Sequence, residues 1–180
     1  MVMSIFVIIT GVIIADMPSF RDKTAIDLIS QEIATTIRQA QVYGIGTREA
    51  GTGFSSYGTH FNVNPSAGGD KKSFILFADL GTPPDEQFTG EPPDKIIERF
   101  SVIGAAEIVS LTGCANSTCS SSENLNNNLD ILFKRFYPEA SFVGGTGNFS
   151  YVEIEVQSTR DTSNNRSIQI WDTGQIVVKN

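Results

Sequence analysis

The chain has 180 residues, 40% of them hydrophobic, and carries 20 Asp and Glu against 13 Lys and Arg, a net charge of −7. This length suits one compact domain with an appendage, and the hydrophobic fraction is ordinary for a folded protein. Binding to a phosphate backbone needs clustered Lys and Arg. The sequence has no such cluster, so its charge argues against nucleic acid as a partner.

The chain starts with an apolar segment, MVMSIFVIITGVIIADMP. A helix made of its first fifteen residues would reach about 22 Å, whereas a membrane hydrocarbon core is about 30 Å thick. We therefore expect roughly five further apolar residues ahead of Met1 if the helix is to span a membrane. A cleavable secretory signal is not indicated, because no Lys or Arg precedes the apolar run and no small-residue cleavage site follows it.

The next segment, residues 19–43, has the period of an amphipathic helix. Apolar residues recur at spacings of three and four, with Ala25, Leu28 and Ala34 widening the stripe. Gly44 and Gly46 are stop signals. The sequence thus predicts one helix of some forty residues, with bends near Gly11 or Pro18, and its packing face consists of Ile26, Ile29, Ile33, Ile37 and Ala40.

After Gly46 the helical period is replaced by short β-branched and aromatic runs between turn signals. Such spacing without intervening helices predicts antiparallel strands, in one sheet or two, with the amphipathic helix covering one sheet face. The expected fold class is α+β, a long N-terminal helix packed on an antiparallel sheet domain. Residues 121–130 are expected to form a loop, and residues 129–142 are expected to contain one strand that ends at Pro138. The other expected strands are 54–63, 73–80, 96–104, 106–113, 151–158, 166–171 and 176–179.

Two cysteines, Cys114 and Cys119, lie in the polar segment TGCANSTCSSS. Close cysteines in such a loop fit a small disulfide in an oxidising compartment, and two free thiols are the alternative. A zinc site would need two more ligands, and His60 is the chain's one histidine.

No pattern in the sequence indicates catalysis. His60 lies in a strand-like run and is expected to be a surface or edge residue. There is no G-x-S-x-G elbow, and the glycine-rich GGTGNFS lacks the lysine of a phosphate-binding loop. Candidate calcium ligands are Asp70, Asp79, Asp85 and Glu86, but their spacing is not that of an EF-hand, so we expect no metal site. Taken together, these patterns predict no enzyme activity and no cofactor.

Four stretches together resemble a known family: VMSIFVIITGVIIADMPSF, IRQAQVYGIGTRE, FKRFYPEA (133–140) and RSIQIWDTGQIVV (166–178). They are similar to type IV pilins and type II secretion pseudopilins, above all to the H-type minor pseudopilins and minor pilins. Gly11 and Pro18 correspond to the helix-breaking positions of that family. The family's processing site, a glycine followed by a methylated phenylalanine, and its glutamate at the fifth mature position do not occur here.

The resemblance implies three segments: an apolar half-helix for the membrane and the filament core (1–18), an amphipathic half (19–45) and a β-rich head (46–180). It implies a structural subunit, held in the bacterial inner membrane by a single span and assembled into an extracellular or periplasmic filament. The implied partners are membrane lipid before assembly, copies of itself or other pilins through the N-terminal helix, and the assembly machinery. The alternative is a membrane-anchored surface binding module, such as an adhesin or a DNA-uptake minor pilin.

Overall fold

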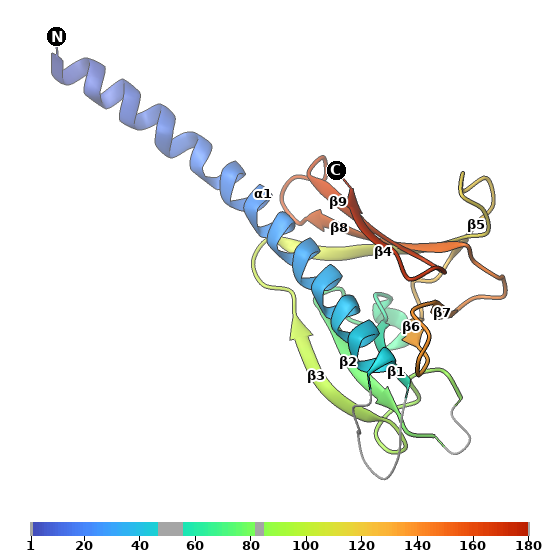
Figure 1. The fold of residues 1–180 in the computed structure, drawn as a ribbon. Helices are drawn as coiled ribbons and strands as arrows, with labels where there is room; N and C mark the ends of the chain where they lie inside the picture. The colour runs from blue at the N-terminus through green and yellow to red at the C-terminus, as the bar shows by residue number, and fades with distance from the viewer. Residues whose placement is uncertain (1, 47–55, 82–84, 180) are drawn as a thin grey trace.

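The computed structural model describes residues 2–46, 56–81 and 85–179, and for residues 2–19 the helical backbone alone. A long helix, α1 (Val2–Ile45), is followed by strands and a short 3-10 turn, η1 (Pro65–Ala67). Figure 1 shows α1 leaving one side of a β domain. The strands are β1 (Ser56–Phe61), β2 (Ser73–Asp79), β3 (Lys95–Ser101), β4 (Ala106–Cys114), β5 (Ser122–Asn124), β6 (Leu129–Phe133), β7 (Ala140–Val143), β8 (Tyr151–Ser158), β9 (Asn165–Trp171) and β10 (Ile176–Lys179).

The strands form two five-stranded sheets, and every strand pairing among the described residues is antiparallel. The first sheet has the order β3-β2-β1-β6-β7, and the second has the order β10-β9-β8-β4-β5. Consecutive hairpins build much of each sheet, but β1 pairs with β6 and β4 pairs with β8. These two long-range pairings divide the strands between the sheets.

The expected fold class is wrong in its central feature, a helix packed on one sheet face of an α+β domain. The described chain is mostly β, in two separate sheets. Helix α1 contacts β1, β2 and β6 of the first sheet and β4, β8, β9 and β10 of the second. The physical reason is that both sheets have an apolar face, and one helix with a wide apolar stripe contributes to the core that both faces share.

The C-terminal end of α1 lies directly against β6. A Cβ atom at Gly44 would come within 2.6 Å of the Phe133 carbonyl oxygen, so this position requires glycine. The amide of Gly46 donates to the carbonyl of Val42 at 2.9 Å as the helix ends. The predicted stop at these glycines is therefore present, and Gly44 has the additional role of allowing the close approach to β6.

Two loop and strand predictions fail. The strand predicted to end at Pro138 ends at Phe133 as β6, and β7 follows it, because the chain turns between them with the amide of Tyr137 donating to the carbonyl of Lys134. Within the expected loop 121–130, Ser122–Asn124 pairs with the end of β4. The predicted strand at 151–158 matches β8, in which Val152, Ile154 and Val156 are buried.

The predicted long helix is present and continues through Gly11 and Pro18 without interruption. Loss of one amide donor at a proline can bend a helix without ending it. Whether these two residues make the helix flexible stays a prediction. Within the part of the chain that the structure describes, no helix is both long enough and apolar enough to cross a membrane.

Candidate functional site

One face of α1 belongs to the core of the β domain. Ile33, Ile37 and Ala40 have no exposed surface, and Ile26 and Ile29 are 2% and 3% exposed. These five residues are the packing face expected from the helical period, and they join the strand residues in one hydrophobic cluster. The helix from about residue 26 onward is therefore a structural part of the domain.

Polar contacts hold the same half of α1 against both sheets. The Gln41 side-chain amide donates to the carbonyl of Pro138, between β6 and β7, at 2.9 Å, and to the carbonyl of Gly174, between β9 and β10, at 3.1 Å. Nε of Arg166 on β9 lies 2.7 Å from a carboxylate oxygen of Asp27. One helix side chain thus bridges turns of the two sheets.

The opposite face of α1 is exposed and partly apolar. Leu28 is 67% exposed and Val42 is 65% exposed, so the expectation that Leu28 widens the buried stripe is wrong. Leu28 lines an apolar groove of about 770 Å³, whose other wall includes Phe100 of β3 and Ile103. Ile103 is 77% exposed. The sequence did not single out Phe100 and Ile103, since they lie in an apolar run that indicated only a strand.

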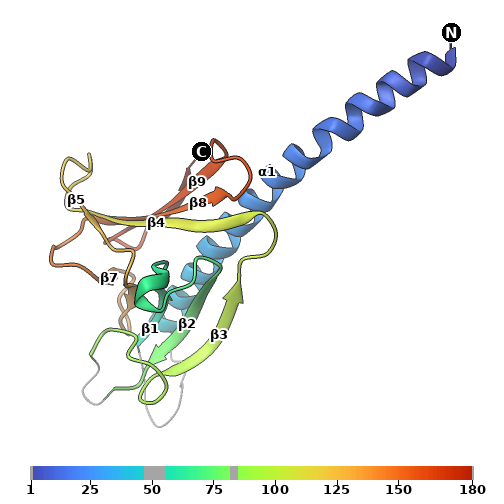
Figure 2. The ribbon, with the colours of Figure 1, turned by 180° about the vertical axis from the view of Figure 1, so that it is seen from behind.

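The N-terminal half of α1 extends away from the β domain. Figures 1 and 2 show this half projecting as a rod from the domain when seen from opposite sides. Phe20, the first helix residue whose side chain is described, is 71% exposed. The sequence of the projecting half is almost entirely apolar and includes Gly11 and Pro18. The helix therefore has one half embedded in the domain and one half that projects from it.

His60 was predicted to be a surface or edge residue. It lies instead on β1, in the interior of the first sheet, and its side chain is 16% exposed. Its Nδ1 lies 2.7 Å from Oδ1 of Asp130, its neighbour across the β1–β6 ladder, and Asp130 is fully buried. Burial raises the pKa of Asp130, while hydrogen bonds from His60, the Phe88 amide and Asn128 act in the opposite direction. Within the described residues no hydrogen bond joins His60 to a hydroxyl or thiol, so the pair resembles a structural contact more than a catalytic one.

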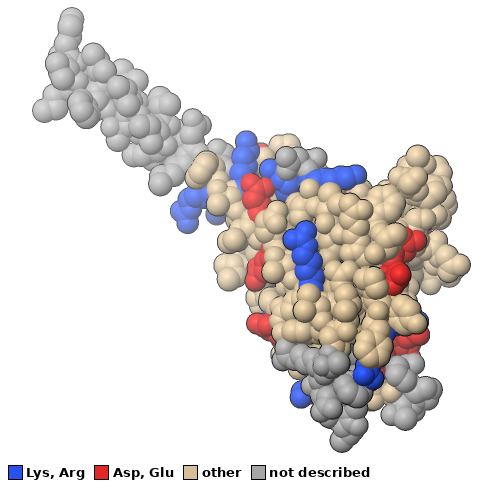
Figure 3. Space-filling view, in the orientation of Figure 1, with Lys and Arg blue, Asp and Glu red and all other residues tan. Residues whose placement is uncertain are grey.

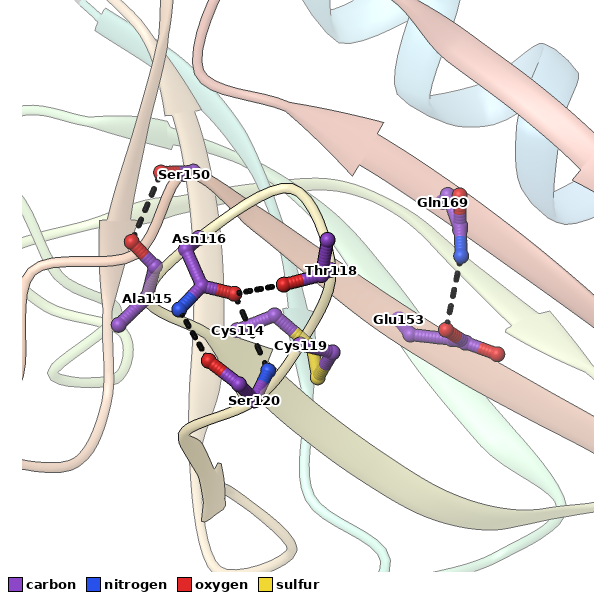
Figure 4. The surroundings of a disulfide bond; sticks show 9 residues. All are labelled: Cys114, Ala115, Asn116, Thr118, Cys119, Ser120, Ser150, Glu153 and Gln169. Atoms are coloured by element: carbon purple, nitrogen blue, oxygen red, sulfur yellow. Dashed lines mark hydrogen bonds between the residues drawn. A yellow bond between two sulfur atoms is a disulfide. The ribbon is translucent and has the colours of Figure 1, made fainter.

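The structure joins Cys114 and Cys119 in a disulfide, with the two Cα atoms 4.8 Å apart. Figure 4 shows the loop closed by this bond around the side chain of Asn116, which accepts from the Ser120 amide and the Thr118 hydroxyl at 3.1 Å each. The Ser150 hydroxyl donates to the Ala115 carbonyl at 2.9 Å, joining this loop to the start of β8. The disulfide bond therefore ties the C-terminal end of β4 to the loop that connects β4 with β5.

The surface charge is dispersed. Figure 3 shows acidic and basic side chains interspersed on one face, with large uncharged areas and no continuous basic surface. Several cations are held in ion pairs with carboxylates, among them Arg160 with Asp22 and Lys134 with Glu86. This face lacks the clustered positive charge that a nucleic-acid backbone requires.

Comparison of the chain with protein-family models, with curated proteins and with solved structures finds no significant match.

Proposed function

We propose that the chain is a structural subunit of a type IV pilus or of a type II secretion pseudopilus, a minor one by its resemblance to the H-type group. The observation that carries the proposal is the division of α1 into two halves. The C-terminal half is embedded between two sheets, and the apolar N-terminal half projects from the domain. A projecting apolar helix needs lipid or other helices around it.

The two halves correspond to the two environments that such a subunit meets. Before assembly the apolar half would lie in the inner membrane, and after assembly it would pack with the helices of neighbouring subunits. The exposed face of the embedded half, with Leu28 and the groove to Ile103, offers further apolar contact to a neighbouring copy. The proposed role is therefore mechanical, and the absence of enzyme activity stays a prediction.

The alternative, a membrane-anchored adhesin or DNA-binding module, has less support. Its DNA-binding form is opposed by the net charge of −7 and by the dispersed cations on the face in Figure 3. The apolar groove lies along the embedded half of α1, where a neighbouring subunit could pack in a filament. We therefore favour assembly over ligand capture.

The test is filament incorporation in the native cell, with the chain expressed from its own gene. Surface filaments or the secretion assembly are sheared or purified, and the chain is quantified by immunoblot. Ile8→Glu places a charge in the apolar half, at a cost of about 2.5–3.5 kcal/mol if that position lies at the centre of a membrane, so we expect at least a tenfold loss of incorporated chain. Thr173→Glu adds the same charge in the exposed β9–β10 turn and serves as the matched control.

Two results would contradict the proposal. One is a wild-type chain that never co-purifies with filaments or with assembly components. The other is an Ile8→Glu chain that is incorporated as well as the Thr173→Glu control, at equal cellular levels.

A further inference from the structure

Three aspartates converge where β2 ends and β3 begins. Asp79 is the last residue of β2, and Asp94 directly precedes β3. The register pairs Ala78 with Lys95, so Asp79 and Asp94 come opposite each other at the end of this ladder. Asp85 lies in the connection between the strands. One carboxylate oxygen from each of the three residues lies within 4.8 Å of those from the other two.

Two of these carboxylates are buried and oriented by hydrogen bonds. Asp79 is 1% exposed and accepts from the amides of Gly81 and Glu86, each at 3.1 Å. Asp94 is 2% exposed, and its Oδ2 accepts from the amide of Thr89 at 2.7 Å and from the Thr89 hydroxyl at 3.2 Å. Their orientations are thus fixed by the surrounding chain.

The second oxygen of Asp94 is the unusual feature of the cluster. Its Oδ1 is buried and has no hydrogen-bond partner. A buried polar atom without a partner costs free energy, and a charged one costs more, so native proteins rarely leave one. This oxygen therefore has an unused capacity to bind a ligand, and the ligand must be a donor or a cation.

The charge around the cluster favours a cation. The described residues show no ion pair to any of the three aspartates, and the nearby Lys134 pairs with Glu86 at 2.8 Å instead. Three carboxylates at this separation repel one another unless a positive charge lies between them.

We propose that Asp79, Asp85 and Asp94 bind a calcium ion. Calcium binds oxygen ligands at about 2.3–2.6 Å, so two ligands of one ion can be about 5 Å apart, which accommodates the observed spread. Magnesium binds at about 2.0–2.1 Å in near-ideal octahedral geometry and usually keeps several waters, so a set of three protein carboxylates favours calcium. Zinc prefers nitrogen and sulfur ligands, and the cluster offers oxygen alone.

The site is anchored to the first sheet. The Phe88 amide donates to Oδ2 of the buried Asp130 at 3.1 Å. The Phe88 ring also packs against His60 and Phe77, at centroid distances of 4.8 and 5.1 Å. The segment between Asp85 and Asp94 is thus held in place without the ion, and the exposed Asp85 leaves a path by which the ion and its remaining water ligands can enter.

The inference does not depend on the proposed filament role and is tested on the purified full-length chain. Equilibrium dialysis with radioactive calcium should show one saturable site per chain. A dissociation constant of about 10⁻⁴–10⁻³ M is expected, the range of extracellular calcium modules. Thermal unfolding should shift to higher temperature as CaCl₂ is added after chelation, because the ion binds the folded state. MgCl₂ at the same concentrations should give a smaller shift.

Three variants separate this site from general charge effects. Asp85→Asn changes an exposed side chain and should leave folding intact, and Asp94→Asn keeps an oxygen that can accept from Thr89. Each should weaken calcium binding at least tenfold. Asp172→Asn removes an exposed carboxylate elsewhere and should bind calcium as the wild type does.

Any of three results would overturn the inference. The first is no saturable binding by the wild type up to ~10 mM calcium, well above the expected range. The second is unchanged calcium binding in Asp85→Asn, which carries the test if Asp94→Asn fails to fold. The third is magnesium binding as tight as that of calcium, which excludes the assignment to this ion.

Discussion

At the scale of single residues, Asp130 is a fully buried carboxyl group with hydrogen-bond partners at both of its oxygens. These partners are His60 and the Phe88 amide. Burial raises its pKa above the ordinary 3.8. A carboxyl with a raised pKa in the folded state binds more protons there than in the unfolded state, so its contribution to stability falls as pH rises.

This sign gives a pH prediction. The contribution of Asp130 is fully present below pH 3.8 and is lost as the pH rises through the raised pKa of the folded state. Asp130→Asn removes the titration, so the wild type should lose stability relative to the variant over that window. Urea unfolding at a series of pH values measures the difference. The comparison is repeated in a His60→Gln background, which isolates the carboxyl group, and parallel curves for the two proteins would contradict the prediction.

The partnership of His60 and Asp130 could not be predicted from the sequence. The two residues are 70 positions apart and meet because β1 pairs with β6 rather than with the next strand alone. Asp130 lies in the apolar run LDILF, where the pattern indicates only a buried strand. The same limit applies to the proposed calcium site. Asp79 and Asp85 were among the candidates, but Asp94 was missed, and Asp70 instead accepts from the amide of Lys72.

At the scale of elements, the helix was the most predictable part. Five apolar residues at spacings of three and four place one face of α1 in the core, and the structure buries all five. Leu28 was misjudged because it lies beside that stripe in the helical projection and is equally apolar. Its surroundings, an open groove toward Ile103, depend on where the β3–β4 turn runs. The spacing of apolar residues along the helix carries no information about the path of that turn.

The two helix faces should respond differently to the same kind of truncation. Ile33→Ala removes a fully buried side chain and should cost about 2–5 kcal/mol of unfolding free energy. Leu28→Ala, on the same helix, removes a side chain that is 67% exposed and should cost under about 1 kcal/mol. Urea denaturation of both variants measures this. Equal costs would mean that the groove side of α1 contributes to the core as much as the buried side does.

Among the strands, the alternation of apolar and polar residues predicted the strand bounds reliably, whereas continuous apolar runs did not. In β8 the buried Val152, Ile154 and Val156 alternate with half-buried polar residues, and its bounds were predicted correctly. In residues 129–142 one strand was predicted to continue to Pro138, because apolar and aromatic residues continue through the turn, whereas β6 ends at Phe133. Phe136 adopts a positive φ of 68° there and is 61% exposed. Its residue type gives no turn signal, since aromatics favour strands.

At the scale of the whole molecule, the sequence indicated antiparallel strands but left open whether they form one sheet or two. Local turns define hairpins such as β9–β10, whereas the division into sheets depends on β1–β6 and β4–β8, which join strands far apart in the chain. The helix then became a shared element of both sheets instead of the cover of one. This arrangement makes its embedded half essential to the domain and separates the projecting half from it.

That separation leads to a prediction about the whole chain. The described core starts at Ile26, and ahead of it Asp22 pairs with Arg160 at 3.3 Å. A chain of residues 19–180 therefore keeps every described core contact and should fold. Its unfolding should be a single transition with a midpoint within a few degrees of that of the full chain, because the removed half contributes no described core residue. The single tryptophan, Trp171, packs against Tyr151 at a centroid distance of 4.7 Å and reports the transition by fluorescence.

The same shortened chain tests the division of roles in α1. It should remain monomeric without detergent and should be absent from filaments in the native cell, because the apolar half that we propose for lipid and helix packing is gone. Sedimentation measures the first outcome and filament immunoblots measure the second, with the full chain as the control. A shortened chain that unfolds far below the full chain would show that the projecting half stabilises the domain. One that still entered filaments would place the assembly contacts on the β domain, with the exposed groove between Leu28 and Ile103 as the next surface to mutate.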